Sequence, residues 1–306
     1  MKKNLIILNP AAHSDRASSL EDQIQSLVDD LEVRLSKMPG DAEQIARTAA
    51  QQGFTTIIAA GGDGTINEVV NGIISSAVPG VSLGILPVGT MNVFALELGI
   101  PLNSVRKAWD IIMKGELGYI DLPRCETTEG SRYFVQLAGV GLDAEVVRRT
   151  SRKSKKKFGP LSYLISLAQV AFRKPSPITM ESDDGKVRKG SFVLLGNGRF
   201  YGGPFKMFRS GSSSDGLLDV LVFQNQSPWD LLRYMHAILM GHHTELDDVE
   251  YFQTSSLHLH SEGIVPYELD GEMVGYLPLS FKLEKSALRV IVPAGRSLMS
   301  GKSAGE

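Results

Sequence analysis

The 306-residue sequence is poor in cysteine, in long apolar runs and in net charge. Its single cysteine, Cys125, cannot form an internal disulfide, which argues against a disulfide-stapled secreted scaffold and predicts a reducing compartment. No apolar run approaches the ~18 residues of a membrane-spanning helix, and the apolar stretch before Asn9 is too short for a signal peptide. We therefore expect a soluble, cytoplasmic protein.

Charge of one sign does not dominate the chain, because 32 Lys and Arg oppose 34 Asp and Glu. The basic segment, residues 148–157, is the exception, since it contains no acid and these seven cations: Arg148, Arg149, Arg152, Lys153, Lys155, Lys156 and Lys157. An apolar helical pattern over 160–172 follows it, which suits peripheral contact with anionic lipid headgroups at the inner face of a membrane. A solvated loop before a packed helix is the alternative. Few aromatic residues interleave with the cations, so nucleic acid is not an expected partner.

Strand and helix patterns alternate over the first 120 or so residues. Strands are predicted at 5–8, 31–35, 54–60 and 81–86, and helices at 20–31, from 41 and from 65. The last two helices show capping-box patterns, Asp41 with Gln44 and Thr65 with Glu68. Strands that alternate with helices predict a parallel sheet with flanking helices. We expect an N-terminal α/β domain over residues 1–122.

The pattern changes after residue 122 to short alternating segments separated by Gly, Ser, Asn and Asp. Strands are predicted at 133–138, 191–195, 218–223, 257–260, 279–283 and 288–292. These segments predict a C-terminal β-rich sandwich domain over residues 123–293, interrupted by helices near 160–172 and 228–240. Residues 294–306 have little to bury and are expected to form a disordered tail.

The strongest local feature is the segment 61–68, Gly-Gly-Asp-Gly-Thr-Ile-Asn-Glu, between a predicted strand and a predicted helix. Glycines allow a tight turn and a close approach to a ligand, and the N–H groups at a helix start favour phosphate. From spacing alone, a tight turn without a ligand is the alternative. A Walker loop is excluded because no lysine follows the glycines, and a dinucleotide fingerprint expects glycine where Asn67 stands.

Six blocks of the sequence together resemble the diacylglycerol kinase catalytic family, which includes bacterial soluble lipid kinases and the sphingosine and ceramide kinases. In the family's order, the blocks are 61–72, 86–95, 139–144, 196–203, 215–220 and 269–272. The more distant NAD kinases share only the Gly-Gly-Asp-Gly-Thr core. The resemblance implies a two-domain fold with the nucleotide between the domains. It also implies an ATP- and Mg²⁺-dependent kinase that phosphorylates a hydroxyl of diacylglycerol or a related membrane lipid.

The same resemblance assigns residues to the nucleotide and to a cation. Those implied for the triphosphate are Asn9, Ser36, Gly61, Gly62, Asp63, Gly64, Thr65, Ile66, Asn67, Glu68 and Thr90. Ser36 stands where the family usually has threonine, and residues 9–13 lack the Ser-Gly pair of the family's first phosphate motif. A second cation site maps to Asp215 with the carbonyl groups of Ser212 and Leu217, whose oxygens suit a hard cation. A plain Asp-Gly turn is the alternative there.

Asp270-Gly271-Glu272 is the candidate for catalysis, because phosphoryl transfer to a hydroxyl needs a carboxylate that accepts the proton. An Asp-Gly hairpin turn is the alternative from the residues alone. The sequence does not separate Asp270 from Glu272 as the general base. Two other functions stay open: an NAD-kinase-like transferase with a soluble acceptor, and a nucleotide-binding sensor with weak or no turnover, suggested by the altered 9–13 loop. A homodimer also stays open.

Overall fold

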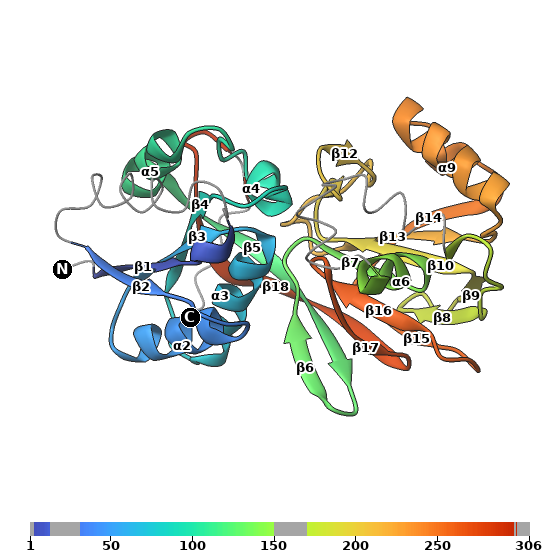
Figure 1. Ribbon diagram of the computed structural model, residues 1–306, viewed down its shortest axis with the longest axis horizontal. Helices are drawn as coiled ribbons and strands as arrows, with labels where there is room; N and C mark the ends of the chain where they lie inside the picture. Colours follow the sequence, from blue (N-terminus) through green and yellow to red (C-terminus); the bar gives the residue numbers. More distant parts are fainter. Residues whose placement is uncertain (1–2, 13–30, 150–169, 297, 299–306) are drawn as a thin grey trace.

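The structure is a computed structural model that describes residues 3–12, 31–149, 170–296 and 298. It contains a ten-stranded sheet and a six-stranded sheet, with helices on their outer faces (Figure 1). The predicted helix over 20–31 lies almost entirely outside the described residues. So do most of the predicted helix over 160–172 and most of the predicted tail. No helix among the described residues is long and apolar enough to cross a membrane.

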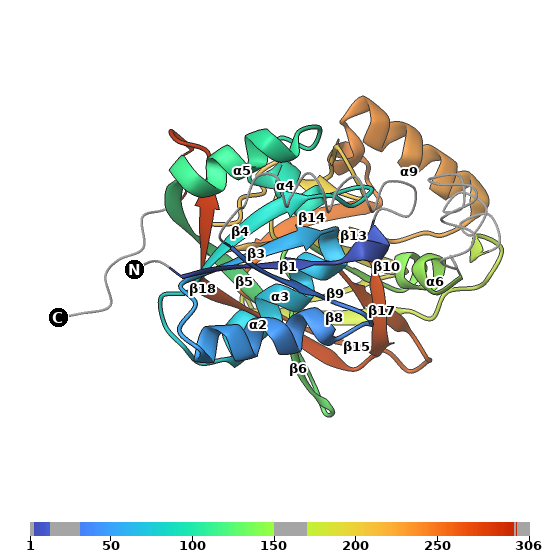
Figure 2. The same ribbon diagram turned by 60° about the vertical axis from the view of Figure 1, so that its left-hand side comes forward.

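The N-terminal half alternates strands with helices. Its elements are β1 (Asn4–Leu8), η1 (Pro10–Ala12), β2 (Glu32–Leu35), α2 (Asp41–Gln51), β3 (Thr56–Gly61), α3 (Asp63–Ser75), β4 (Ser82–Pro87), α4 (Val93–Glu97), α5 (Val105–Lys114) and β5 (Glu116–Thr127). Strands β2, β1, β3 and β4 are parallel neighbours, and every residue of β3 and β4 is buried. Helices α2 and α3 cover one face and α4 and α5 the other (Figures 1 and 2). The predicted α/β fold with a parallel sheet is confirmed.

The C-terminal half is a sandwich of two sheets. Its elements are β6 (Gly130–Tyr133), β7 (Leu137–Val140), α6 (Leu142–Arg149), β8 (Ile178–Ser182), β9 (Val187–Gly190), β10 (Phe192–Gly196), β11 (Phe200–Tyr201), β12 (Phe205–Lys206), β13 (Leu218–Phe223), α9 (Pro228–Met240), η2 (His243–Glu245), β14 (Val249–Thr254), β15 (Ser256–His260), β16 (Pro266–Leu269), β17 (Glu272–Tyr276) and β18 (Leu279–Val292). The six-stranded sheet has the order β14-β13-β10-β7-β16-β17. A buried apolar cluster fills the space between this sheet and β8, β15 and β18. The predicted sandwich is therefore confirmed.

Strand β18 joins the two halves in one sheet. The sequence predicts two strands, at 279–283 and 288–292, and this division is wrong because a single strand continues through a register shift between Glu284 and Leu288. Its first part pairs antiparallel with β15, and Arg289 and Val290 pair parallel with β4. The boundary predicted at residue 122 falls inside β5, and the division into domains 1–122 and 123–293 stays a prediction.

Candidate active site

The glycine-rich loop lies at the carboxyl edge of the parallel sheet. Because β3 ends at Gly61 and α3 begins at Asp63, only Gly62 separates the strand from the helix. A Cβ added to Gly89, in the loop after β4, would lie 2.4 Å from the Cα of Gly62. This backbone-to-backbone approach requires glycine, and it fixes the start of α3, whose first N–H groups have no acceptor within the helix.

Two more of the predicted nucleotide residues lie at this edge. The side-chain amide of Asn9, after β1, donates to the Thr65 hydroxyl at 2.9 Å. Ser36, after β2, is buried, and its N–H donates to the Leu8 carbonyl at 2.9 Å. The Asn9 Oδ1 atom of the side chain accepts from the Ala11 N–H, so the turn after β1 is closed although the Ser-Gly pair is absent. The structure thus brings Asn9 and Thr65 together.

Asp63 joins the glycine-rich loop to helix α4. Its Oδ1 accepts a hydrogen bond from the Phe94 N–H at 3.1 Å. Burial raises the pKa of Asp63, whereas the N–H groups of residues 92–94, at the start of α4, lower it. Thr90 is exposed in the same connection, beside Gly89. The assignment of both residues to a triphosphate stays a prediction.

Two side chains of the segment 61–68 have structural partners elsewhere. Ile66 is fully buried in the apolar core of the N-terminal half. The Glu68 carboxylate accepts the N–H groups of Gly40 at 3.0 Å and Ala42 at 3.1 Å, and so caps α2. The capping box predicted for Thr65 and Glu68 is wrong, because α3 begins before Thr65 and Glu68 serves the neighbouring helix.

Asp41 likewise does not cap α2 as the sequence predicted. Its carboxylate accepts the N–H groups of Lys37 and Met38 in the preceding turn instead. The N-cap position of α2 is Gly40, which has a positive φ of 90° and no side chain with which to cap the helix. The prediction failed because Asp41 is already the first helical residue, and its carboxylate is occupied by the N–H groups of the preceding turn, while Glu68 of another helix accepts the N–H groups of Gly40 and Ala42.

Asp270 and Gly271 form a two-residue hairpin turn between β16 and β17. Both have positive φ, 48° and 82°, as in a type I′ turn. The Asp270 side chain nevertheless points inward, since it is 8% exposed and accepts four hydrogen bonds of 2.8 to 3.0 Å. The donors are the N–H groups of Val135, Gln136 and Leu137 and the side-chain amide of Asn67. Burial raises the pKa of Asp270 to about 6 even though these donors lower it.

The three consecutive backbone donors explain an error in the predicted strands. The alternation over 133–138 predicts one continuous strand, but β6 ends at Tyr133 and β7 begins at Leu137. In a strand, successive N–H groups point to opposite sides, so three in a row cannot reach one carboxylate. The chain leaves the strand conformation here to bind Asp270.

Asn67 connects the glycine-rich end of α3 to this hairpin turn. Its side-chain amide donates to Asp270 Oδ2 at 2.8 Å, and its carbonyl oxygen accepts from Arg132 at 3.1 Å. Asn67 is itself buried. The side chain is thus engaged with the turn that carries the candidate catalytic acids, and its assignment to the nucleotide stays a prediction.

Glu272, the first residue of β17, lies beside the start of α3. A Cβ added to Gly64 would be 3.1 Å from the Oε1 atom of Glu272. Unlike Asp270, Glu272 is exposed, and no described residue donates a hydrogen bond to its carboxylate. The structure therefore brings together one of the two candidate acids and the glycine-rich loop, although they lie some two hundred residues apart in the sequence.

The loop 212–217, which carries the predicted second cation site, contacts β5 through Asp121. The Asp121 carboxylate accepts the Gly216 N–H at 2.7 Å, and Asp215 Oδ1 accepts the Leu217 N–H at 3.0 Å. Burial raises the pKa of Asp215, the Leu217 N–H lowers it, and the Asp121 charge raises it again. Sequence reasoning missed Asp121, although an acid inside the apolar stretch 120–122 was a usable signal.

The donor set around Asp215 suits a hard cation. It offers a carboxylate in a partly desolvated place, and the predicted remaining ligands are carbonyl oxygens of Ser212 and Leu217. Among residues 3–12, 31–149 and 170–296, no group of three or more His, Cys, Asp or Glu side chains could hold a metal ion. A cation at this loop therefore depends on backbone oxygens, and the site stays a prediction.

Arg148 and Arg149 are the two residues of the basic segment that the structure describes, and the other five lie outside it. Arg148 and Arg149 form ion pairs with Glu145 of α6 at 2.7 and 3.0 Å, and Arg173 reaches the same carboxylate at 3.3 Å. The hydrogen bond from Arg148 is the main reason that the pKa of Glu145 is lowered. Three guanidinium groups around one acid leave this surface positive.

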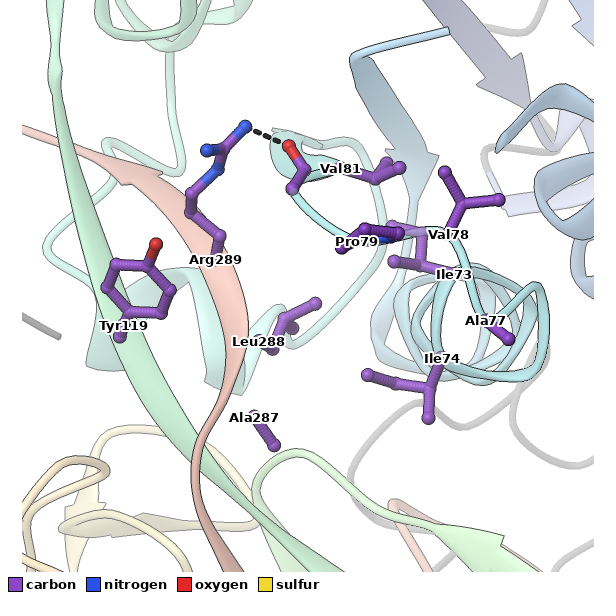
Figure 3. A pocket seen from close by; sticks show the side chains of 11 residues that line it. Ile73, Ile74, Ala77, Val78, Pro79, Val81, Tyr119, Ala287, Leu288 and Arg289 are labelled. Carbon is purple, nitrogen blue, oxygen red and sulfur yellow. Dashed lines mark hydrogen bonds between the residues drawn. The ribbon is translucent and has the colours of Figure 1, made fainter. Parts of the chain in front are cut away.

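A cavity of about 210 Å³ lies elsewhere in the N-terminal half, between the end of α3, β5 and β18 (Figure 3). Its described lining is apolar except for Tyr119 and Arg289. The Arg289 guanidinium is engaged with the Gly80 carbonyl and, at 2.7 Å, with the Ser82 hydroxyl. No carboxylate and no predicted site residue is among the described residues that line this cavity. The cavity is therefore not a candidate active site.

Known proteins match both halves of the chain. Residues 3–125 match the family described as Diacylglycerol kinase catalytic domain, and residues 136–292 match the YegS C-terminal NAD kinase beta sandwich-like domain. The chain is 30% identical to a Bacillus subtilis (strain 168) protein named "Diacylglycerol kinase", over 96% of this chain and 97% of the relative. It is 31% identical to "Probable lipid kinase YegS-like" of Chromohalobacter salexigens, over 88% of this chain and 86% of that one. A solved crystal structure from Bacillus anthracis strain Sterne is similar with a TM-score of 0.80 at 26% identity, over 95% of each chain.

Proposed function

The chain belongs to the diacylglycerol kinase catalytic family, and we propose that it transfers the γ-phosphoryl group of ATP to a hydroxyl of diacylglycerol or a closely related membrane lipid, with Mg²⁺ as the metal ion. The observation that carries this proposal is the position of Glu272. Its carboxylate is exposed and lies against Gly64, at a helix start of the kind that binds phosphate groups.

The nucleotide side of the proposed reaction is built mainly from backbone. The start of α3 presents N–H groups and the positive end of a 13-residue helix, both of which favour a phosphate group. The contact between Gly62 and Gly89 leaves no room for a side chain there, so a phosphate can approach the main chain closely. The Asn9–Thr65 hydrogen bond holds the neighbouring loop against this helix.

Glu272 is the better candidate for the general base. An ionised carboxylate has about four acceptor positions, and Asp270 already uses its two oxygens in four hydrogen bonds. A proton from the lipid hydroxyl therefore has no vacant lone pair on Asp270, whereas Glu272 accepts no hydrogen bond from any described residue. In the proposed step, the lipid oxygen attacks the γ-phosphorus, its proton passes to Glu272, and ADP leaves. Asp270 fixes the turn from which Glu272 projects.

Mg²⁺ supplies neutralisation of the phosphate charge in transfers of this class. The structure offers the oxygen chemistry that such an ion prefers at Asp215, where Asp121 adds a second carboxylate nearby. We propose that Asp215, with the carbonyl groups of Ser212 and Leu217, holds a cation that stabilises the loop next to β5. We assign Asp63 to holding the glycine-rich loop against α4, since its carboxylate accepts a hydrogen bond from the start of that helix.

We further propose that the protein reaches its lipid through the surface around α6. Phe172 is 82% exposed and Ile264 is 84% exposed, and Arg148, Arg173 and Lys174 lie with Ile264 around a cavity of about 320 Å³. Exposed apolar side chains among cations suit an anionic bilayer surface, where each cation contributes ~1 kcal/mol of binding. The five cations of the basic segment outside the described residues follow α6 directly in the sequence and add to this charge.

A panel of acceptors with labelled ATP tests the proposed reaction. Purified full chain is incubated with γ-labelled ATP, Mg²⁺ and detergent micelles that contain diacylglycerol, monoacylglycerol, ceramide or sphingosine, and in parallel with NAD. We expect label on diacylglycerol or a related lipid, and loss of transfer when EDTA removes Mg²⁺. Label on NAD but on no lipid would establish the NAD-kinase-like alternative. Tight ATP binding without transfer to any acceptor would establish the sensor.

Vesicle sedimentation tests the membrane contact separately. The wild type and the double variant Phe172→Ser/Ile264→Ser are compared on two kinds of vesicle. One is phosphatidylcholine alone, and the other contains about one third phosphatidylglycerol, an anionic lipid. We expect the wild type to bind the anionic vesicles and the double variant to bind them several-fold more weakly. Equal sedimentation of the two proteins would remove this surface from the proposal and leave the proposed reaction intact.

A further inference from the structure

A buried acid, Glu268, lies directly beneath the turn that carries Glu272. Its side chain is fully buried, and its Oε2 atom accepts the Gly271 N–H at 2.6 Å. The register of β16 against β17 shifts between Tyr267 and Glu268, and such an irregularity changes the direction in which side chains point. Glu268 is therefore bonded to the residue that separates the two candidate catalytic acids.

A second acid and a phenol surround the other oxygen of Glu268. The Tyr201 hydroxyl of β11 lies 2.8 Å from Asp143 Oδ2 and 3.3 Å from Glu268 Oε1. A Cβ added to Gly139 of β7 would be 2.6 Å from Asp143 Oδ2 and 2.9 Å from Glu268 Oε1. Two carboxyl groups and a hydroxyl thus crowd above one glycine, where no larger residue fits.

This arrangement favours a proton on one of the two carboxyl groups. Two ionised carboxylates buried in contact repel strongly, and the Tyr201 hydroxyl has one proton to donate. Burial raises the pKa of Glu268 well above its usual value, and the Asp143 charge adds to the effect. The pKa of Tyr201 is raised in the same way, by burial and by both acids, so the phenol stays protonated.

Within the part of the chain that the structure describes, the titratable groups that face Glu268 come from three neighbouring elements. They are Asp143 at the start of α6, Tyr201 of β11, and Asp270 in the turn itself. Asp143 and Asp270 both disfavour a negative charge on Glu268, whereas the Gly271 N–H favours it. One proton distribution fits these contacts: Tyr201 donates to Asp143, and Glu268 donates its own proton to Asp143. The second Glu268 oxygen then accepts from Gly271.

We infer that Glu268 is a positioning residue for the general base: as a neutral acid anchored on Asp143 and Tyr201, it holds the Gly271 N–H and thereby sets the direction in which Glu272 leaves the turn. This inference rests on the proposed role of Glu272. It extends that role to a buried group that does not touch the substrate. Four hydrogen bonds fix Asp270 on one side of Gly271, and the bond to Glu268 fixes Gly271 itself.

Three substitutions of Glu268 separate its charge, its hydrogen bond and its volume. In Glu268→Gln, the carboxamide reproduces the neutral acid, since its oxygen accepts from Gly271 and its NH₂ group donates to Asp143. In Glu268→Leu the volume is kept and the acceptor is lost, and in Glu268→Ala both are lost. Glu262→Gln, at an exposed position, is the matched control. All variants are assayed as full chains, and kcat and ATP KM are measured from about pH 6 to about pH 10. This range lies above the usual pKa of a carboxyl group.

We expect the wild type to lose activity at alkaline pH as the shared proton leaves. We expect Glu268→Gln to keep kcat within about threefold of the wild type and to show no such loss, because its amide cannot lose that proton. Glu268→Leu is expected to lose about 10²-fold in kcat with ATP KM nearly unchanged, as misplacement of a catalytic group by ~1 Å costs about that much. Amide hydrogen exchange at Gly271 should be faster in the Leu and Ala variants than in the wild type and the Gln variant.

Two outcomes would overturn the inference. One is a Leu variant with wild-type kcat and wild-type exchange at Gly271, and the other is a Gln variant as impaired as the Leu variant. The exchange measurement does not depend on turnover. If the wild type transfers phosphate to no lipid, the proposed function fails, while exchange at Gly271 still decides whether Glu268 holds the turn. The Gln variant keeps the test decisive if the Ala variant does not fold.

Discussion

The two sides of the candidate site present different chemical groups. The side formed by the parallel sheet consists of glycines, helix N–H groups and one half-buried acid, Asp63, that accepts a hydrogen bond from the start of α4. The side formed by the sandwich consists of buried carboxyl groups, among them Asp270 and Glu268, with their hydrogen-bond donors. Substitutions should therefore act through backbone geometry on the first side and through charge and protonation on the second.

The largest effect is expected from Glu272→Gln. Loss of a general base lowers kcat by about 10²- to 10⁴-fold. Because the side chain is exposed, the melting temperature and the ATP dissociation constant should stay at their wild-type values. Calorimetric titration with ATP and single-turnover transfer to diacylglycerol measure the two quantities. A variant that retains a tenth or more of the wild-type kcat would exclude Glu272 as the base.

Asp270→Asn sharpens the contrast within the same turn. An amide NH₂ group in place of one oxygen faces hydrogen-bond donors rather than acceptors. The free energy of unfolding of this variant should therefore fall by about 1–3 kcal/mol, and its turnover should fall as well. Urea unfolding of Asp270→Asn next to Glu272→Gln provides the measurement. Equal stability of the two variants would contradict the buried, fully bonded state of Asp270.

Two alanine substitutions test the backbone-built side. Gly89→Ala places a Cβ 2.4 Å from the Gly62 Cα, so the loops must separate and ATP binding should weaken by about tenfold or more. Gly64→Ala meets only the flexible end of Glu272, at 3.1 Å, and should lower kcat without weakening ATP binding. Fluorescence or calorimetric ATP titrations distinguish the two. The division of roles fails if Gly64→Ala weakens ATP binding as much as Gly89→Ala does.

Asp219, in β13, should make the stability of the sandwich side depend on pH. It is fully buried, and burial raises its pKa to about 7, although hydrogen bonds from Tyr251 and Gln253 lower it. The unfolded chain has a pKa near 3.9, so from about pH 4 to pH 7 the folded state binds more protons and stability falls as the pH rises. Asp219→Asn should remove this fall, which amounts to about 3 kcal/mol between pH 5 and pH 8. Urea unfolding at pH 5 and pH 8 measures it, and an unchanged pH slope would refute the assignment.

Glu68→Gln should have the smallest effect. Its carboxylate caps α2, and a weaker cap costs about 1 kcal/mol of folding free energy. If capping is its role, ATP KM stays at the wild-type value and only thermal unfolding changes. A raised ATP KM with unchanged stability would instead assign Glu68 to the triphosphate, as the resemblance implied.

The fold class follows from sequence pattern because burial on two faces leaves continuous apolar strands. The residues of β3 and β4 are all buried, which is why their apolar runs were readable. The continuity of β18 was not readable, since Glu284 and the exposed Lys285 and Ser286 interrupt the alternation where the strand bulges. A prediction made from neighbouring residues alone therefore places a turn at this interruption.

The candidate site was located from motifs, whereas the separation of roles within it needed the structure. Sequence could not choose between Asp270 and Glu272, because the difference lies in donors from residues 135–137, more than 130 positions away. The same holds for Glu268, which looks like an ordinary strand glutamate until Asp143 and Tyr201 are placed against it. Long-range hydrogen bonds carry this information, and no local pattern encodes them.

Strand β18 also has a consequence for biosynthesis. The edge of β4 receives its parallel partner only from residues 289 and 290, near the end of the chain. Domains usually fold in order of emergence from the ribosome. Here the first part of the sheet to be translated is completed by β18, the last strand of the described residues, so the nascent N-terminal half has an open β4 edge until residues 289 and 290 are made. An open edge is prone to pairing with other chains, so this topology exposes the nascent protein to such pairing during synthesis.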